Sequence, residues 1–79
     1  MSKLKCWKKV KENNNLLRFQ NTKYPSKEVS IRWNPVTGKW QSYATDGDIE
    51  VADFGRFKDK DKGQAISFAQ KYMKEHNSC

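Results

Sequence analysis

The sequence is poor in the residues from which most catalytic and metal sites are built. Its 79 residues include one histidine, His76, and two cysteines, Cys6 and Cys79, near opposite ends of the chain. No serine or cysteine motif indicates a nucleophile, and the four glycines are too scattered for a phosphate-binding loop. A zinc site built from the two cysteines and the histidine would lack a fourth ligand. We therefore predict a protein that is not an enzyme and that uses no metal or cofactor.

Long apolar segments are also missing. No stretch approaches the roughly 20 apolar residues that a membrane-spanning helix needs. The basic N-terminus lacks the apolar run of a secretory signal peptide, so we expect a cytoplasmic protein with no membrane partner. In that compartment we expect Cys6 and Cys79 to be free thiols rather than a disulfide.

Acidic residues are almost absent from the first third of the chain. Residues 1–27 hold eight bases and one acid, Glu12, whereas residues 28–79 hold eight of each. The whole formal net charge of +7 therefore lies in residues 1–27. A field this one-sided concerns binding partners rather than the fold, and it favours a polyanion as the partner. Among polyanions we expect nucleic acid ahead of a membrane surface.

What the chain does contain is enough aromatic surface for a small core. The three Trp, three Tyr and four Phe accompany a hydrophobic content of 35% and a charged content of 32%. This composition is polar but not typical of disorder. We predict one domain over residues 1–79, with a modest core and little room for an enclosed substrate pocket.

The C-terminal segment has the pattern of an amphipathic helix. A spacing of about 3.6 residues places its apolar side chains on one side and its polar side chains on the other. The apolar side comprises Ala65, Ile66, Phe68, Ala69, Tyr72, Met73 and His76. Asp61 and Gln64 have the spacing of a capping box, and Asn77 is a suitable stop. We predict a helix over residues 61–76 that packs on a sheet through Phe68, Ala69, Tyr72 and Met73.

Three strand patterns precede this helix. Residues 28–34 alternate apolar and polar side chains, which is the period of a half-buried strand. Residues 34–38 have turn chemistry, with a proline and a glycine, and a second alternating strand follows over residues 39–45. The Asp-Gly pair at 46–47 is a hairpin signal, and a third strand follows over residues 49–54. We therefore predict a three-stranded antiparallel meander within residues 28–57.

The basic third of the chain, residues 1–27, is open to two interpretations. Residues 6–10 and 16–20 can form a hairpin around the three asparagines at 13–15, because asparagine tolerates the left-handed conformation. The competing interpretation is a frayed basic arm. The predicted fold class is thus α+β, an antiparallel sheet of three to five strands with the C-terminal helix packed on one face.

A sheet covered on one face by the helix leaves its other face open. If Ile31, Trp33 and Trp40 are buried, neighbouring Arg, Lys, Gln and Tyr side chains point outward, and these residue types hold phosphates and contact base edges. Any antiparallel sheet with one wet face has a similar pattern, but the basic first third adds weight to nucleic acid. The predicted nucleic-acid-binding residues are Lys5, Trp7, Lys8, Lys9, Lys11, Arg18, Arg32, Lys39, Gln41 and Tyr43. Trp7 is explained equally well as a stacking platform and as a core residue.

Four short motifs resemble a known family of DNA-binding domains. They are Ile31-Arg32-Trp33, Gly38-Lys39-Trp40-Gln41, Phe54-Gly55-Arg56-Phe57, and the helix residues Ala65, Ala69 and Tyr72. Residues 29–73 thereby resemble the ethylene-response-factor (apetala-type) domain and the arm-binding domains of phage and transposon integrases. The resemblance implies a three-stranded sheet on one helix that lays its sheet in the DNA major groove through Arg32, Lys39, Gln41 and Tyr43. The family has more arginines on the first strand, and the N-terminal third has no counterpart in it.

Two classes of function follow from these features. The first is a small basic nucleic-acid-binding module, with DNA ahead of RNA, in which a basic hairpin contacts phosphates and the open sheet face contacts the groove. The alternative is a protein-interaction module, such as a phage or mobile-element accessory protein. That module would dock its basic hairpin on an acidic protein or pair an edge strand with another chain. A charged domain whose surface serves solubility is a third interpretation. We expect a monomer or a weak dimer in each case.

Overall fold

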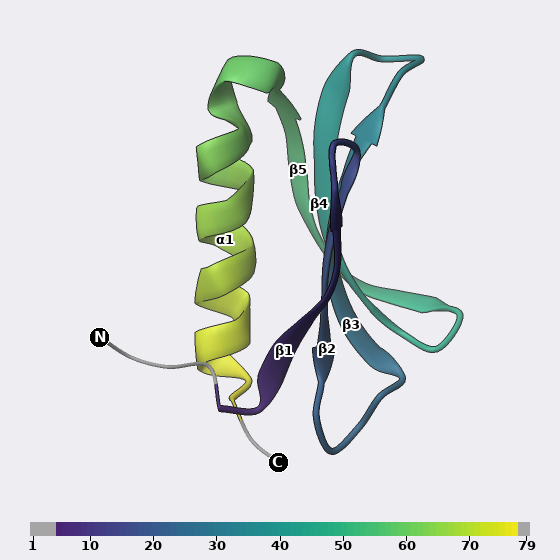
Figure 1. The fold of residues 1–79 in the computed structure, drawn as a ribbon, viewed down its shortest axis with the longest axis vertical. Helices are drawn as coiled ribbons and strands as arrows, with labels where there is room; N and C mark the ends of the chain where they lie inside the picture. Colours follow the sequence, from purple (N-terminus) through teal and green to yellow (C-terminus); the bar gives the residue numbers. More distant parts are fainter. Residues whose placement is uncertain (1–4, 78–79) are drawn as a thin grey trace.

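The computed structural model describes residues 5–77 as an antiparallel sheet covered on one face by a helix (Figure 1). The strands are β1 (Trp7–Asn13), β2 (Leu16–Asn21), β3 (Lys27–Asn34), β4 (Lys39–Asp46) and β5 (Ile49–Lys58). A 3-10 turn, Asp59–Asp61, leads into the helix α1 (Lys62–Glu75). The five strands lie in chain order, each antiparallel to the next. The predicted α+β class is confirmed.

The basic third of the described chain is an ordered hairpin, not an arm. β2 pairs with β3 along its length, with Leu17 opposite Ile31 and Phe19 opposite Val29. Leu17 is buried and Phe19 packs against the core, so the hairpin continues the meander rather than hanging from it. Apolar burial of this kind stabilises a hairpin that would be marginal alone.

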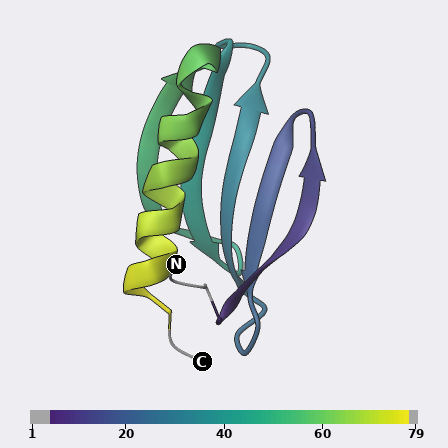
Figure 2. The ribbon, with the colours of Figure 1, turned by 60° about the vertical axis from the view of Figure 1, so that its left-hand side comes forward.

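The core lies between α1 and the strands β3, β4 and β5, as both ribbon views show (Figures 1 and 2). The fully buried side chains of α1 are Ala65, Ala69 and Met73, which repeat every four residues. Two alanines in this stripe let the helix approach the sheet closely, and Ser42 on β4 donates a hydrogen bond of 3.0 Å to the Ala65 carbonyl oxygen. Phe68, predicted to pack inward, is 48% exposed because it lies beside the stripe rather than in it.

The helix starts differently from the prediction. Asp61 is at the N-cap, but its side chain makes no capping hydrogen bond, so the predicted capping box is wrong. The preceding 3-10 turn replaces it, since the Lys62 N–H donates to the Asp59 carbonyl oxygen. The Asp59 carboxylate instead accepts a hydrogen bond of 3.0 Å from the Trp40 indole N–H.

The start of β1 is tied to the end of α1. The Trp7 indole N–H donates to the His76 carbonyl oxygen at 3.2 Å, and the Cys6 N–H donates to Asn77 Oδ1 at 2.9 Å. Cys6 is also disulfide-bonded, so the predicted free thiol is wrong at this position. The fold brings two regions together that are about 70 residues apart in sequence, which cysteine spacing alone does not reveal. Cys79 lies outside the described residues.

Two strands are interrupted by bulges. The register of β1 shifts between Lys9 and Lys11. The register between β4 and β5 shifts twice, between Ser42 and Tyr43 and between Ala44 and Thr45. β5 also continues to Lys58, past the predicted end at residue 54, through Gly55, whose φ of 110° suits glycine. Because a bulge inserts one extra residue, it changes which side chains face the helix.

Within residues 5–77, α1 is too short and too polar to cross a membrane.

Candidate nucleic-acid interface

The face of the sheet opposite α1 is not covered by any other element of the described chain (Figure 2). We call it the open face. Cross-strand register decides which side chains belong to it, because directly paired residues point to the same side of a sheet. Trp33 pairs with Trp40, and Trp40 pairs with Phe57, on the helix-covered side. The adjacent set Arg32, Gln41 and Arg56 therefore belongs to the open face.

Cations outnumber acids on this face. Its seven bases come from all five strands and are Lys8, Lys11, Arg18, Arg32, Lys39, Arg56 and Lys58. Its three acids are Glu28, Glu50 and Asp53. Glu28 and Glu50 both pair with Thr45, so they lie in one row near the β4–β5 turn. The positive field therefore covers the rest of the face, from the β1–β2 hairpin to the β3–β4 turn.

At the centre of the open face, one arginine is held in place by a neighbour. Arg18 and Tyr43 flank Ser30 in register, from β2 and β4. The Arg18 Nε–H donates to Ser30 Oγ at 3.2 Å, and Ser30 is only 2% exposed although it lies on the open side. A guanidinium fixed by one N–H keeps its other donors for a ligand and loses less entropy on binding.

Arg56 is already partly neutralised. Its guanidinium lies 3.1 Å from the Asp53 carboxylate, and the Gly55 N–H donates to the same carboxylate at 2.9 Å. The Gly55 hydrogen bond, followed by the Arg56 contact, holds the pKa of Asp53 below its usual value. Six bases of the open face, all except Arg56, therefore remain without a carboxylate partner among the described residues.

The β1 bulge separates the lysines of the first hairpin. Lys8 pairs with Gln20 and Lys11 with Arg18, which places both lysines on the open face. Lys9 pairs with Phe19 on the opposite side, where its Nζ lies 3.1 Å from Glu12 Oε1. Neighbouring lysines of one strand therefore face opposite sides of the sheet, and one of them is paired with an acid.

Seven of the ten predicted site residues thus belong to one surface and three do not. The seven are Lys8, Lys11, Arg18, Arg32, Lys39, Gln41 and Tyr43. Lys5 is exposed in the turn before β1 and has no place in the register. Lys9 faces the helix side, and Trp7 is 7% exposed with its indole N–H bonded to His76, which supports its alternative interpretation as a core residue.

The sequence prediction missed two bases of the open face, Arg56 and Lys58. Both lie on the part of β5 beyond residue 54, where the predicted strand ends. The signal that was available is Gly55, since a glycine inside a strand pattern indicates a bulge and not always an end.

Arg32 is bordered by two hollows at the end of the sheet near the β3–β4 turn. One, of about 460 Å³, is also lined by Asn13, Asn15 and Leu16. The other, of about 320 Å³, is also lined by Asn34, Val36 and Gln41. Amide side chains on both sides of a guanidinium supply hydrogen-bond donors and acceptors beside a charge that suits a phosphate.

No cluster of three potential metal ligands occurs within residues 5–77. Comparison of the chain with protein-family models, with curated proteins and with solved structures gave no match.

Proposed function

We propose that this protein is a small, non-enzymatic nucleic-acid-binding module that binds duplex DNA through the open face of its sheet. The observation that supports the proposal is the concentration of seven bases against three acids on that face. Lysine and arginine contacts to phosphates release condensed counterions, which supplies most of the affinity of sequence-independent binding. The first hairpin and the meander act together here, because Lys8 and Lys11 lie on the same surface as Arg32 and Lys39.

Duplex DNA suits this surface better than RNA or single strands. The major groove of B-form DNA admits a β-ribbon, whereas the major groove of A-form RNA is too narrow. Single strands are held mainly by bases stacking on exposed aromatic rings. Among the described strand residues, Tyr43 is the one aromatic side chain that the register places on the open face, and it is half-buried. The resemblance of residues 29–73 to sheet-reading DNA-binding domains favours the same partner.

Edge-strand pairing with another chain is less well supported than DNA binding. The outer strands of the sheet are β1 and β5, and each is interrupted by a bulge. β1 also carries three lysines. Bulges and lysines are features with which proteins protect sheet edges from added strands. An acidic protein that docks on the open face remains the alternative partner, and we propose a monomer.

The cytoplasmic location expected from the sequence remains part of the proposal. The disulfide of Cys6 is the feature that argues against it, because such bonds persist mainly in oxidising compartments. Thiol alkylation of protein taken directly from cells, followed by mass measurement, decides the matter. Alkylated Cys6 agrees with a reducing compartment, and unmodified Cys6 that reacts only after reduction contradicts it.

The proposal is tested by fluorescence anisotropy with a labelled mixed-sequence duplex. We expect Arg32→Gln to weaken binding at low salt, because it removes a cation from the middle strand of the cationic surface. Lys71→Gln on the exposed side of α1 is the matched control and should leave the affinity unchanged. An equal loss of affinity in Arg32→Gln and Lys71→Gln would mean that the net charge of the protein, and not the open face, governs binding. Absence of binding at low salt would overturn the proposal and favour an acidic protein partner.

A further inference from the structure

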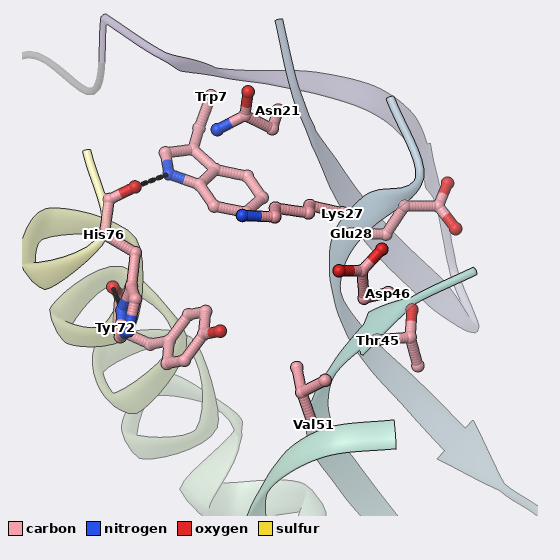
Figure 3. Close-up of a pocket in the computed structure, with 9 residues that line it drawn as sticks. All are labelled: Trp7, Asn21, Lys27, Glu28, Thr45, Asp46, Val51, Tyr72 and His76. Atoms are coloured by element: carbon pink, nitrogen blue, oxygen red, sulfur yellow. Dashed lines mark hydrogen bonds between the residues drawn. The ribbon is translucent and has the colours of Figure 1, made fainter. Parts of the chain in front are cut away.

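A cavity of about 190 Å³ lies on the other side of the sheet, between the end of α1 and the starts of β1 and β3 (Figure 3). Nine residues line it, namely Trp7, Asn21, Lys27, Glu28, Thr45, Asp46, Val51, Tyr72 and His76. An engineered apolar cavity of about 150 Å³ accommodates a benzene ring, so this space is large enough for a planar ring system. Apart from Glu28 and Thr45, its lining residues do not belong to the open face, so the cavity is separate from the cationic surface proposed to bind DNA.

The cavity has aromatic walls on one side and polar groups on the other. Figure 3 shows the Trp7 indole and the Tyr72 ring on the side of α1 and β1, and Asp46 on the side of the sheet. Tyr72 is held in position by His76, whose ring stacks on it at 4.0 Å between centroids. Two aromatic side chains at one cavity favour a flat, polarisable ligand over an aliphatic one.

One polar group at this cavity lacks a partner. Asn21 is 2% exposed, and its Oδ1 accepts hydrogen bonds from the backbone N–H groups of Lys23 and Tyr24, both at 2.9 Å. These two bonds fix the orientation of the amide, because only the oxygen can accept them. The Asn21 Nδ2 is therefore the group left over, and it donates to no atom of residues 5–77. No buried side-chain nitrogen or oxygen of the described residues lacks a hydrogen-bond partner, so this amide N–H2 reaches the open space of the cavity, where it can donate to a ligand acceptor.

The charged groups of the cavity complement this donor. Lys27 and Asp46 are direct cross-strand neighbours on β3 and β4, yet they form no ion pair within the described part of the chain. Asp46 accepts a hydrogen bond of 2.9 Å from the Ser26 hydroxyl through Oδ1, which leaves Oδ2 for another donor. Glu28 does not compete, because its carboxylate is directed away from the cavity in Figure 3.

We propose that this cavity binds a guanine base. Its Watson–Crick edge presents one acceptor, O6, beside two donors, N1–H and the 2-amino group. The carboxylate of Asp46 suits the two donors, and the Asn21 amide N–H and the Lys27 ammonium suit O6. Trp7 and Tyr72 supply the surfaces against which the ring packs. Adenine presents a single donor group on this edge and no acceptor equivalent to O6, so it fits the same polar groups less well.

The test is a titration of isotope-labelled protein with guanosine, inosine and adenosine, followed through the Trp7 indole and Asn21 side-chain amide resonances. We expect saturable shifts at both groups with guanosine, weaker binding of inosine, which lacks the 2-amino group, and the weakest binding of adenosine. Asp46→Asn should weaken guanosine binding by about tenfold or more, since it removes a charged acceptor. Asp48→Asn, the same charge change two residues away and outside the cavity, should leave it unchanged.

Equal binding of the three nucleosides, or equal behaviour of the two aspartate variants, would overturn the proposal. Asn21→Asp keeps the acceptor for the turn and replaces the unpartnered N–H2 donor by a charged oxygen, so it gives a second test if Asp46→Asn does not fold. We expect it to weaken guanosine binding too, and unchanged binding would contradict the proposed contact to O6. A duplex with one unpaired terminal guanine distinguishes the source of the base. Shifts at Trp7 with this duplex and not with guanosine would assign the site to a strand end.

Discussion

The bulge in β1 leads to a quantitative prediction about salt dependence. Lys11 lies on the open face, whereas Lys9 lies on the opposite side and is paired with Glu12. Each phosphate contact contributes about −0.9 to the slope of log affinity against log salt. If the six unpaired bases of the open face all contact phosphates, the wild-type slope is about −5. Lys11→Gln should reduce this slope by about 0.9, and Lys9→Gln should leave it unchanged.

The assay is fluorescence anisotropy with one labelled duplex over a series of salt concentrations. Between 50 and 200 mM salt the wild type should lose roughly 2,000-fold in affinity and Lys11→Gln roughly 500-fold. The two variants change the same strand by the same charge, so the comparison isolates the direction in which the side chain points. A slope reduced equally in both variants, or reduced only by Lys9→Gln, would refute the assignment of the open face as the DNA surface.

Three further predictions concern the fold and its titration. In urea unfolding, Met73→Ala should lower the free energy of unfolding by about 2–5 kcal/mol, whereas Phe68→Ala should cost much less because Phe68 is half-exposed. Ser42→Ala should cost about 1 kcal/mol through the lost bond to α1, while Ser67→Ala on the exposed side of the helix should be neutral; equal effects would contradict the packing. Because the pKa of Asp53 is lowered in the folded state, the charged carboxylate stabilises the fold at pH above its unfolded value of 3.8. That stabilisation should be lost as pH falls through the lowered pKa, and Asp53→Asn should remove this component; an Asp53 carboxyl resonance that titrates at or above 3.8 would contradict it.

Much of the fold is predictable because its strands and helix have clear periods. The alternation around Val29 and Ile31 predicts β3, and the apolar side predicted for the helix includes its three buried residues, Ala65, Ala69 and Met73. The turn between β3 and β4 also follows from sequence, because Gly38 has a positive φ of 66°. These features depend on residues close together in the chain.

The rest depends on contacts that no local pattern encodes. Simple alternation would place Lys9 and Lys11 on the same side of the sheet, whereas the bulge between them places them on opposite sides. Nothing in the lysine-rich sequence marks this bulge. The burial of Trp7 requires the end of α1, which is 69 residues away in sequence. The cavity beside Trp7 likewise needs residues from all five strands and from α1, so no local sequence pattern indicates it.

The most direct test of the central claim is to map backbone amide shifts while titrating labelled protein with a mixed-sequence duplex at low and then physiological salt. The proposed interface predicts shifts concentrated around Lys11, Arg18, Arg32, Gln41 and Lys58, with little change along α1, and weaker binding as salt rises. Shifts concentrated on α1, or no shifts at low salt, would contradict binding of DNA by the open face of the sheet.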